Sequence, residues 1–450
     1  MGLTGKMPVL RENRRMETME GQRVVVMGLG RFGGGVGVTR WLCGQGARVT
    51  VTDLAPAEQL AESVAKLAGL DVTFRLGGHD EADLDACDLL VVNPAVPNEA
   101  PFLIAANRRG VPITTEINLF CQRCPGRLIG ITGSVGKSTT AAMTAEVLAT
   151  TYRTHLGGNI GRSLLDEIAE GTIKEGHLVV LELSSFQLER MAAIRLSPPV
   201  ALVTNLRPNH LDRHGTLDAY ADAKKNIFRF QKPQDLLIVS AEDPAVSAWA
   251  AEAPGRVATF GVVDAPFELV LPGQHNQLDA QAAWAIGKAL GVTRQAAAAA
   301  LRDFRGLPHR LALVAERGGV RFFDDSKATT PDSALVALRS FEAGTVVAIV
   351  GGYDKHVPLD ELCRQLARHC KAVVATGQVG EQLAQGVLAH MPSERRSAVA
   401  LEPSFDAAVA AAMRQAAPGD VVLLSPACAS YGQFTNFMER GRRFQSLVGG

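Results

Sequence analysis

Short apolar runs alternate along this chain with alanine-rich and amphipathic stretches. Gln22–Gly28, Leu128–Thr132 and Leu178–Glu182 each carry about four apolar residues and end in glycine, hydroxyl or acidic positions. Runs of this length bounded by turn residues predict buried strands, and the stretches between them predict helices. Strand–helix alternation throughout the chain predicts an α/β fold with mostly parallel sheets that helices cover on both faces.

Three blocks follow from this alternation, and a chain of 450 residues has room for about three domains. We expect a Rossmann-like N-terminal domain at 21–117, a P-loop-type central ATPase domain at 118–306 and a Rossmann-like C-terminal domain at 307–450. Residues 1–20 carry basic residues but no apolar core of a signal peptide, so we expect a disordered tail, or an upstream start ahead of Met7, Met16 or Met19.

Composition and charge exclude several classes of partner. Forty-six basic and 46 acidic residues cancel, so nothing indicates a nucleic-acid or membrane surface as partner. No apolar run approaches the ~20 residues that a membrane span needs. The seven cysteines include a Cys121–Cys124 pair but no second pair of matching spacing, which predicts unpaired, reduced thiols and a cytoplasmic location.

The segment Gly130–Thr140 predicts a phosphate-binding loop. Thr132–Ser138 reads T-G-x-x-G-K-S between a predicted strand and a predicted helix. Glycines let backbone N–H groups converge on phosphates, Lys137 can reach the outer phosphates, and the Ser138 hydroxyl can bind magnesium. Ile131 stands where the longer P-loop pattern has its first glycine, so an ordinary strand–helix turn remains the alternative.

A second glycine turn lies near the N-terminus. Gly28-Leu-Gly30-Arg-Phe-Gly33 follows a predicted strand, and the next predicted strand ends at Asp53. This is the pattern of a dinucleotide-binding turn with an acid at ribose distance, and it serves any nucleotide diphosphate equally well. A third predicted strand ends at the Asn93–Pro97 loop, where prolines stop it.

Three groups in the middle block are candidates for chemistry. Glu182 ends a predicted buried strand. Its carboxylate there either binds magnesium or is exposed to water. His210 and His214 have the i,i+4 spacing of a zinc pair but lack a third ligand, which favours a surface or capping role. Lys224 and Lys225 lie on a predicted amphipathic helix, and the default interpretation is a solvated basic face.

Taken together and in order, these motifs resemble the Mur ligase family, and the resemblance covers roughly residues 20–447. The matching blocks are Thr132–Ser138, Gly157–Gly161, Leu181–Glu189, His210–Asp212, Gly273–Asn276, Gly306–Arg310, Asp325–Thr329 and Leu424–Ser430. Asp-Ser-Lys-Ala-Thr and Ser-Pro-Ala-Cys-Ala-Ser are similar to the D-glutamate-adding branch.

The resemblance implies a reaction. ATP would phosphorylate the L-alanyl carboxylate of UDP-N-acetylmuramoyl-L-alanine, and the amine of D-glutamate would attack the acyl phosphate, in a protein expected to act as a monomer. Three alternatives remain open: a sibling ligase that adds another amino acid, a noncatalytic nucleotide-binding regulator, and a nicotinamide-dependent oxidoreductase built on Gly28–Asp53. The oxidoreductase leaves the phosphate loop and Glu182 unexplained.

The resemblance also implies roles for residues. The residues with implied catalytic roles are Lys137, Glu182, His210, Lys224 and Lys327. ATP contacts fall on Gly133, Ser134, Val135, Gly136, Lys137, Ser138, Thr139, Asn276, Arg310 and Asp325. The UDP substrate would contact Gly30, Arg31, Phe32, Asp53, Asn93, Asn159 and Ser184, and D-glutamate would contact Lys327, Thr329, Lys355, Ser430 and Phe437. Two Mg²⁺ ions, replaceable by Mn²⁺, are expected on Ser138, Glu182, His210 and a carbamylated Lys224.

Four positions depart from the family pattern. Val135 and Asp279 stand where asparagine is usual, Asn209 replaces an acid before His210, and Tyr431 replaces a smaller apolar residue. Because no essential charge is lost, we expect these departures to alter nucleotide and substrate contacts and to leave catalysis in place.

Overall fold

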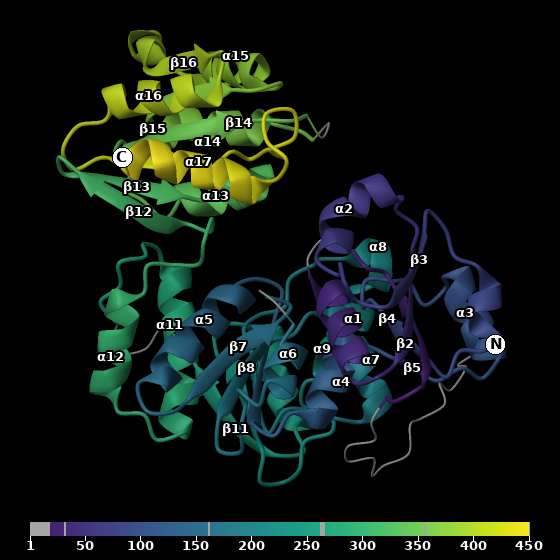
Figure 1. Ribbon diagram of the computed structural model, residues 1–450. Helices are drawn as coiled ribbons and strands as arrows, with labels where there is room; N and C mark the ends of the chain where they lie inside the picture. Colours follow the sequence, from purple (N-terminus) through teal and green to yellow (C-terminus); the bar gives the residue numbers. More distant parts are fainter. Residues whose placement is uncertain (1–18, 31–32, 161–162, 262–265, 355–356, 450) are drawn as a thin grey trace. The chain divides into compact units, whose positions relative to one another are not determined.

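The computed structural model describes residues 19–30, 33–160, 163–261, 266–354 and 357–449 (Figure 1). It is an α/β protein with three sheets, as the alternation of apolar runs predicts. The chain forms two compact units: residues up to Pro266 together with Leu278–Ala297, and Phe267–Gln277 together with Ala298–Gly450.

The first sheet has the parallel order β3-β2-β1-β4-β5. Its strands are β1 (Arg23–Met27), β2 (Arg48–Asp53), β3 (Val72–Leu76), β4 (Leu89–Val92) and β5 (Ile113–Thr114). Its helices are α1 (Gly34–Gly44), α2 (Ala57–Ala65), η1 (Glu81–Leu84), α3 (Pro101–Arg108) and α4 (Glu116–Arg123). One face packs under α3, and the other shares a continuous apolar core with the second sheet.

The second sheet, in the same unit, has the parallel order β11-β10-β9-β6-β8-β7. Its strands are β6 (Arg127–Thr132), β7 (Thr154–Gly158), β8 (Leu178–Glu182), β9 (Val200–Val203), β10 (Leu236–Ser240) and β11 (Arg256–Phe260). Its helices are α5 (Lys137–Ala149), α6 (Leu165–Ala169), α7 (Ser185–Met191), η2 (Ala192–Ile194), α8 (Leu211–His214), α9 (Leu217–Lys225), α10 (Pro244–Ala248) and η3 (Trp249–Glu252). Two further helices, α11 (Gln274–Ala289) and α12 (Arg294–Asp303), carry residues of both units.

The third sheet, in the second unit, has the order β12-β13-β17-β14-β15-β16. Its strands are β12 (Ala312–Arg317), β13 (Val320–Asp324), β14 (Val346–Gly351), β15 (Cys370–Thr376), β16 (Val399–Glu402) and β17 (Val421–Leu424). Its helices are α13 (Pro331–Leu338), α14 (Asp360–His369), α15 (Gly380–His390), η4 (Ser393–Ala398), α16 (Phe405–Gln415) and α17 (Phe437–Gly449). Separate apolar cores form under α13–α15 and under α16–α17, on opposite faces (Figure 1).

One element of this sheet departs from the parallel prediction. β12 and β13 pair antiparallel, because only Gly318 and Gly319, both with positive φ, join them. Two residues suffice for a hairpin, whereas a parallel pair needs a long crossover. All seven cysteines are free thiols. Among the residues with described coordinates, no helix is both long and apolar enough to cross a membrane.

Candidate functional site

The turn between β6 and α5 is shaped to receive an anion. Gly133 and Gly136 have φ of 150° and 84°, a region that other residues rarely adopt. A Cβ atom at Gly133 would lie 1.9 Å from the Thr204 hydroxyl, so the chain can pass only with glycine. The first N–H groups of α5 have no carbonyl partner within the helix and lie at its positive end. Lys137, at the start of α5, donates from Nζ to the Ser134 carbonyl over 2.9 Å.

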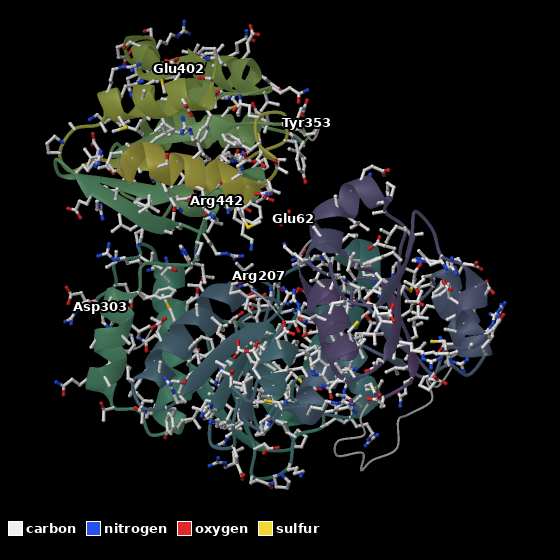
Figure 2. All side chains as sticks on the ribbon, viewed as in Figure 1. Glu62, Arg207, Asp303, Tyr353, Glu402 and Arg442 are labelled. Carbon is white, nitrogen blue, oxygen red and sulfur yellow. The ribbon has the colours of Figure 1, made fainter. Side chains whose placement is uncertain are left out.

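Residues that follow β9 hold this loop in place. The Asn205 side chain accepts from the Val135 N–H at 2.9 Å and donates to the Val135 carbonyl at 3.0 Å, and the Thr204 hydroxyl donates to that carbonyl at 2.8 Å. The Ser134 hydroxyl donates to the Arg207 carbonyl and accepts from its N–H, at 2.9 and 2.8 Å (Arg207 is labelled in Figure 2). The loop therefore has a preformed shape.

Glu182 lies beside this loop and is buried, which rules out the alternative of a strand-end acid exposed to water. β8 pairs with β6 in a register that sets Glu182 opposite Ile131. The residue is 2% exposed, and Oε1 accepts from the Asn159 amide at 2.9 Å. Among the described residues, Oε2 is buried without a hydrogen-bond partner. A buried carboxylate oxygen without a donor fits a cation, and carboxylate and hydroxyl oxygens such as that of Ser138 suit Mg²⁺.

Lys224 points from α9 into the same region. Its residue is 1% exposed, and Nζ donates to the Gly133 carbonyl at 2.8 Å. The ammonium position lies 4.5 Å from the centre of the Tyr220 ring. The default of a solvated basic face is therefore wrong for Lys224. Lys225 is half-buried: its Nζ pairs with the exposed Glu252 and lies 5.5 Å from the centre of the Trp249 ring.

The surroundings of Lys224 disfavour its charged form. Burial, and next the positive charge of Lys137, lower the pKa of Lys224 to about 6, against the opposing effect of Glu182. A lysine with this pKa is largely a neutral amine at neutral pH. A neutral amine is a nucleophile, whereas an ammonium is not.

His210 and His214 flank the Phe186 ring and do not form a zinc pair. Their ring centres lie 5.0 and 5.3 Å from that of Phe186, and the His214 ring Nε2 lies 3.0 Å from the Ser185 hydroxyl. His210 is exposed and precedes α8 (Leu211–His214) as its N-cap residue, with φ of 52°. Among residues with described coordinates, no cluster of three or more His, Cys, Asp or Glu side chains could hold a metal ion. A role for His210 in magnesium binding stays a prediction.

Two cavities open at the carboxyl ends of the first sheet. One of about 260 Å³ lies between the sheets, with Gly34 and Asn93 on one wall and Asn159 and Ser184 on the other. The second, about 400 Å³, includes Asp53 in its lining.

The turn after β1 shapes both cavities. The Asp53 carboxylate accepts from the Gly30 N–H at 3.0 Å and so fixes the turn. A Cβ at Gly35 would lie 2.3 Å from the Leu29 carbonyl, which brings α1 close against the strand. The N-terminus of α1 thus lies at the cavity, as phosphate binding requires. Arg31 and Phe32 lie outside the described residues.

The second unit gathers most of the residues predicted for D-glutamate. Lys327 Nζ lies 5.7 Å from the centre of the Phe437 ring, and the Ser326 hydroxyl donates to the Phe437 carbonyl at 2.8 Å. Ser430 is buried, and Thr329 is half-buried. Lys355 lies outside the described residues.

Asp325, Arg310 and Asn276 also belong to this unit. Asp325 accepts from the Ser425 hydroxyl at 2.8 Å and from the Leu311 N–H at 3.1 Å, yet burial raises its pKa to about 7. The Asn276 amide is buried and donates to the Pro272 carbonyl at 2.6 Å. Their predicted contacts with ATP stay predictions.

Three family models match the chain in order: the Mur ligase MurD-like N-terminal domain at residues 22–115, the Mur ligase middle domain at 131–268 and the Mur ligase glutamate ligase domain at 309–428. A UDP-N-acetylmuramoylalanine–D-glutamate ligase of Roseiflexus sp. is 39% identical over 96% of this chain and 99% of its own length. The chain belongs to the Mur ligase family. The Symbiobacterium thermophilum enzyme of the same name is also 39% identical, over 95% of this chain and 98% of its own.

Solved structures agree on the fold of this Mur ligase. UDP-N-acetylmuramate-alanine ligase MurC from Thermotoga maritima has a TM-score of 0.61 at 22% identity and covers 94% of this chain and 98% of its own. MurF from Acinetobacter baumannii has a TM-score of 0.57 at 17% identity, over 95% and 93% of the two chains. The expectation of a three-domain α/β fold is confirmed.

Within the Mur ligase, the structure brings together one group of predicted residues. Gly133–Thr139, Glu182, Lys224, Asn159 and Ser184 meet at the carboxyl end of the second sheet. Sequence reasoning missed Asn205, although its place directly after a buried strand is a usable signal.

The departures from the family pattern have structural counterparts in this Mur ligase. Asn205 supplies the amide contacts of the loop around Val135. Asp279 accepts from the Thr140 hydroxyl at 2.7 Å, in the interior. Asn209 accepts from the backbone N–H that follows it at 2.9 Å. Tyr431 is 54% exposed and packs edge-on against Tyr353.

Proposed function

We propose that this Mur ligase joins D-glutamate to UDP-N-acetylmuramoyl-L-alanine, with ATP converted to ADP and phosphate, as in the synthesis of peptidoglycan precursors. ATP would transfer its γ-phosphoryl group to the L-alanyl carboxylate. The D-glutamate amine would then attack the acyl phosphate, form the amide and release phosphate. Relatives named for this ligase match along nearly the whole chain and support the substrate pair.

The single observation that carries the proposal is the arrangement around Glu182. Its carboxylate lies beside the phosphate loop and also bonds Asn159, which lines the cavity assigned to the UDP substrate. A carboxylate to be activated in that cavity would therefore lie next to the phosphoryl donor. An oxidoreductase would not need a phosphate loop next to the substrate cavity. A nucleotide-binding regulator would not need Glu182 and Lys224 buried beside the phosphate loop.

The chain's own groups match the demands of phosphoryl transfer, in which negative charge spreads over the phosphoryl oxygens. The N–H groups at the start of α5 and the Lys137 ammonium would stabilise that charge and orient the γ-phosphate. Asn159 and Ser184 would position the L-alanyl end. Ser138, Glu182 and His210 would hold two Mg²⁺ ions, replaceable by Mn²⁺, whose chemistry is to neutralise phosphate charge.

We propose that the working form of Lys224 is a carbamate. The neutral amine would attack CO₂, form an N–C bond and release one proton, which leaves a carboxylate at the end of the side chain. The low pKa of Lys224 supports the first step, because only the neutral amine reacts. The product would add anionic oxygens beside Glu182, where a second cation would balance them.

Substrates would divide among three domains. Residues 21–117 would bind the UDP group with Gly30, Arg31, Phe32, Asp53 and Asn93, and residues 118–306 would bind ATP. Residues 307–450 would bind D-glutamate with Lys327, Thr329, Lys355, Ser430 and Phe437, since two lysines suit a dicarboxylate. Asn276, Arg310 and Asp325 would complete the ATP site. Because one chain would supply every proposed substrate contact, we propose a monomer that acts in the cytoplasm, where ATP and nucleotide sugars are made.

A phosphate-release assay tests the function. The purified chain is given ATP, magnesium and UDP-N-acetylmuramoyl-L-alanine with each of a panel of amino acids. We expect release to require the UDP substrate and D-glutamate, with L-glutamate as the matched control. Release with another amino acid in place of D-glutamate would assign a sibling ligase, and no release with any would reject ligase activity.

A further inference from the structure

The cavity between the first two sheets combines two features that oppose each other electrostatically. The N-terminus of α1 reaches it at Gly34 and Gly35, where helix geometry favours an anion. Glu116, the first residue of α4, lines the same cavity. An ionised carboxylate there would repel the diphosphate of a nucleotide sugar.

Glu116 is held in this position by defined contacts. Its Oε1 accepts from the Ser163 hydroxyl at 2.6 Å. Ser163 is fixed in turn by α1, because a Cβ at Gly37 would lie 2.3 Å from the Ser163 Cβ. Among the described residues, no hydrogen bond reaches Glu116 Oε2, so it is the carboxyl oxygen left for a ligand in the cavity.

The charges around Glu116 do not favour its ionised form. Burial, against the weaker effect of the Ser163 hydrogen bond, raises the pKa of Glu116 to about 7, and the negative charge of Asp166 adds to the rise. Asp166 is itself paired with Arg40 at 3.0 Å. The other charged and titratable residues on α4 and on the helices packed against it are Arg40 and Cys43 of α1, Asp166 and Glu167 of α6, Glu189 and Arg190 of α7, and Cys121 and Arg123 of α4.

We propose that Glu116 is a substrate-binding residue that takes up a proton when the UDP substrate enters the cavity and donates it in a hydrogen bond to a substrate oxygen. This inference rests on the proposed function. It adds a neutral acid to the contacts that recognise the nucleotide sugar, and nothing in the motifs of the chain assigns this role.

Binding of the UDP substrate and protonation of Glu116 are linked equilibria. A bound diphosphate brings negative charge close to Glu116 and displaces water, and both effects favour the protonated acid. A protonated carboxyl then donates to a phosphate or sugar oxygen, whereas an ionised one can only accept. Binding should therefore consume a proton whenever free Glu116 is ionised.

Titration calorimetry with the full chain and UDP-N-acetylmuramoyl-L-alanine tests this step. The diphosphate of this ligand is a diester without a group that titrates near neutral pH. Measurements in buffers of different ionisation enthalpy report the protons taken up. With a pKa of about 7, wild type should take up roughly nine-tenths of a proton at pH 8 and one-tenth at pH 6, and should bind about tenfold more weakly at pH 8.

Two variants separate Glu116 from other titrating groups. Glu116→Gln keeps the shape of the protonated acid, so we expect affinity near the wild-type value at pH 6 and no proton uptake from this residue at pH 8. Ser163→Ala removes a bond that favours the ionised form, so free Glu116 should stay protonated to higher pH and uptake at pH 7.5 should fall. His79, in the neighbouring cavity, would contribute equally in all three proteins.

The outcomes are distinct. Equal proton uptake by wild type and Glu116→Gln would overturn the inference and leave the proposed function intact. If the wild-type protein binds the UDP substrate at pH 8 without proton uptake, the inference is also overturned and the proposed function is again left intact. Failure of wild type to bind the UDP substrate at any pH would instead overturn the proposed function and the inference with it.

Discussion

Replacement of Lys224 by methionine should stabilise the first unit while it abolishes ligation. Methionine keeps the length and apolar stem of lysine but carries no charge. In the wild type, the amine must be neutral to be buried beside Lys137, since the pKa of Lys224 lies at about 6 against 10.5 in the unfolded chain. The variant removes that requirement and, with it, the amine that would carry the carbamate.

The size of the effect follows from linkage. Between pH 6 and 10.5 the unfolded chain binds one proton more at Lys224 than the folded chain, so wild-type stability rises with pH through this window. At pH 8, which is 2.5 pH units below 10.5, keeping the amine neutral costs about 3 kcal/mol, and at pH 6.5 about 5 kcal/mol. Methionine leaves the Gly133 carbonyl without its donor, which costs about 1–3 kcal/mol. A net gain of about 1 kcal/mol at pH 8 and 3 kcal/mol at pH 6.5 remains.

Urea unfolding followed by tryptophan fluorescence measures this gain. Trp41, Trp249 and Trp284 all belong to the first unit, so the signal reports the unit that contains Lys224. Buffers should be free of CO₂ so that no carbamate forms. Lys225→Met is the matched control, since Lys225 pairs with an exposed glutamate and such ion pairs contribute little to stability.

A destabilised Lys224→Met protein at pH 6.5 would refute the reasoning, because it would mean that the buried lysine is ionised and paired in the folded chain. A gain in stability that does not change between pH 6.5 and 8.5 would refute it equally. In that case the effect would come from packing and not from a proton.

Other substitutions test separate parts of the site. Glu182→Gln should keep the thermal midpoint and lower kcat by about 100-fold or more, since an amide cannot replace the charge that would bind Mg²⁺; unchanged turnover at saturating magnesium would remove Glu182 from the site. Asn205→Ala should raise KM for ATP about tenfold by loosening the loop at Val135; a Km for ATP equal to that of wild type would show that the loop keeps its shape without the amide. Ser430→Ala and Lys355→Ala should raise KM for D-glutamate far more than KM for ATP, and equal increases for both would defeat the assignment.

Much of this architecture is accessible from sequence because its signals are local. Apolar runs bounded by glycine mark most strands of the sheets, and the glycines of the Thr132–Ser138 turn have the positive φ that their spacing predicts. Helix periodicity separates Lys224 from Lys225 by about 100°, which agrees with one fully buried and one half-buried lysine.

The remaining features depend on contacts between distant segments. The burial of Glu182 depends on segments outside β8, among them β6 beside it and Asn159, which bonds its carboxylate, and no pattern within β8 reports that. Glu116 meets Ser163 across 47 positions of sequence, so neither segment alone indicates a cavity acid. The antiparallel β12–β13 hairpin is the exception: its signal is local, two adjacent glycines between short strands, but the strand–helix alternation around it favours a parallel pair.

In the proposed reaction, the γ-phosphoryl group of ATP is transferred to the L-alanyl carboxylate at the site around Glu182, and phosphate then leaves with one of the carboxylate oxygens. Its most direct test uses UDP-N-acetylmuramoyl-L-alanine with both carboxylate oxygens labelled with ¹⁸O, together with ATP, magnesium and D-glutamate. The account predicts that one labelled oxygen appears in the released phosphate and the other in the new amide, in equal amounts. Release of unlabelled phosphate while the amide forms would contradict it.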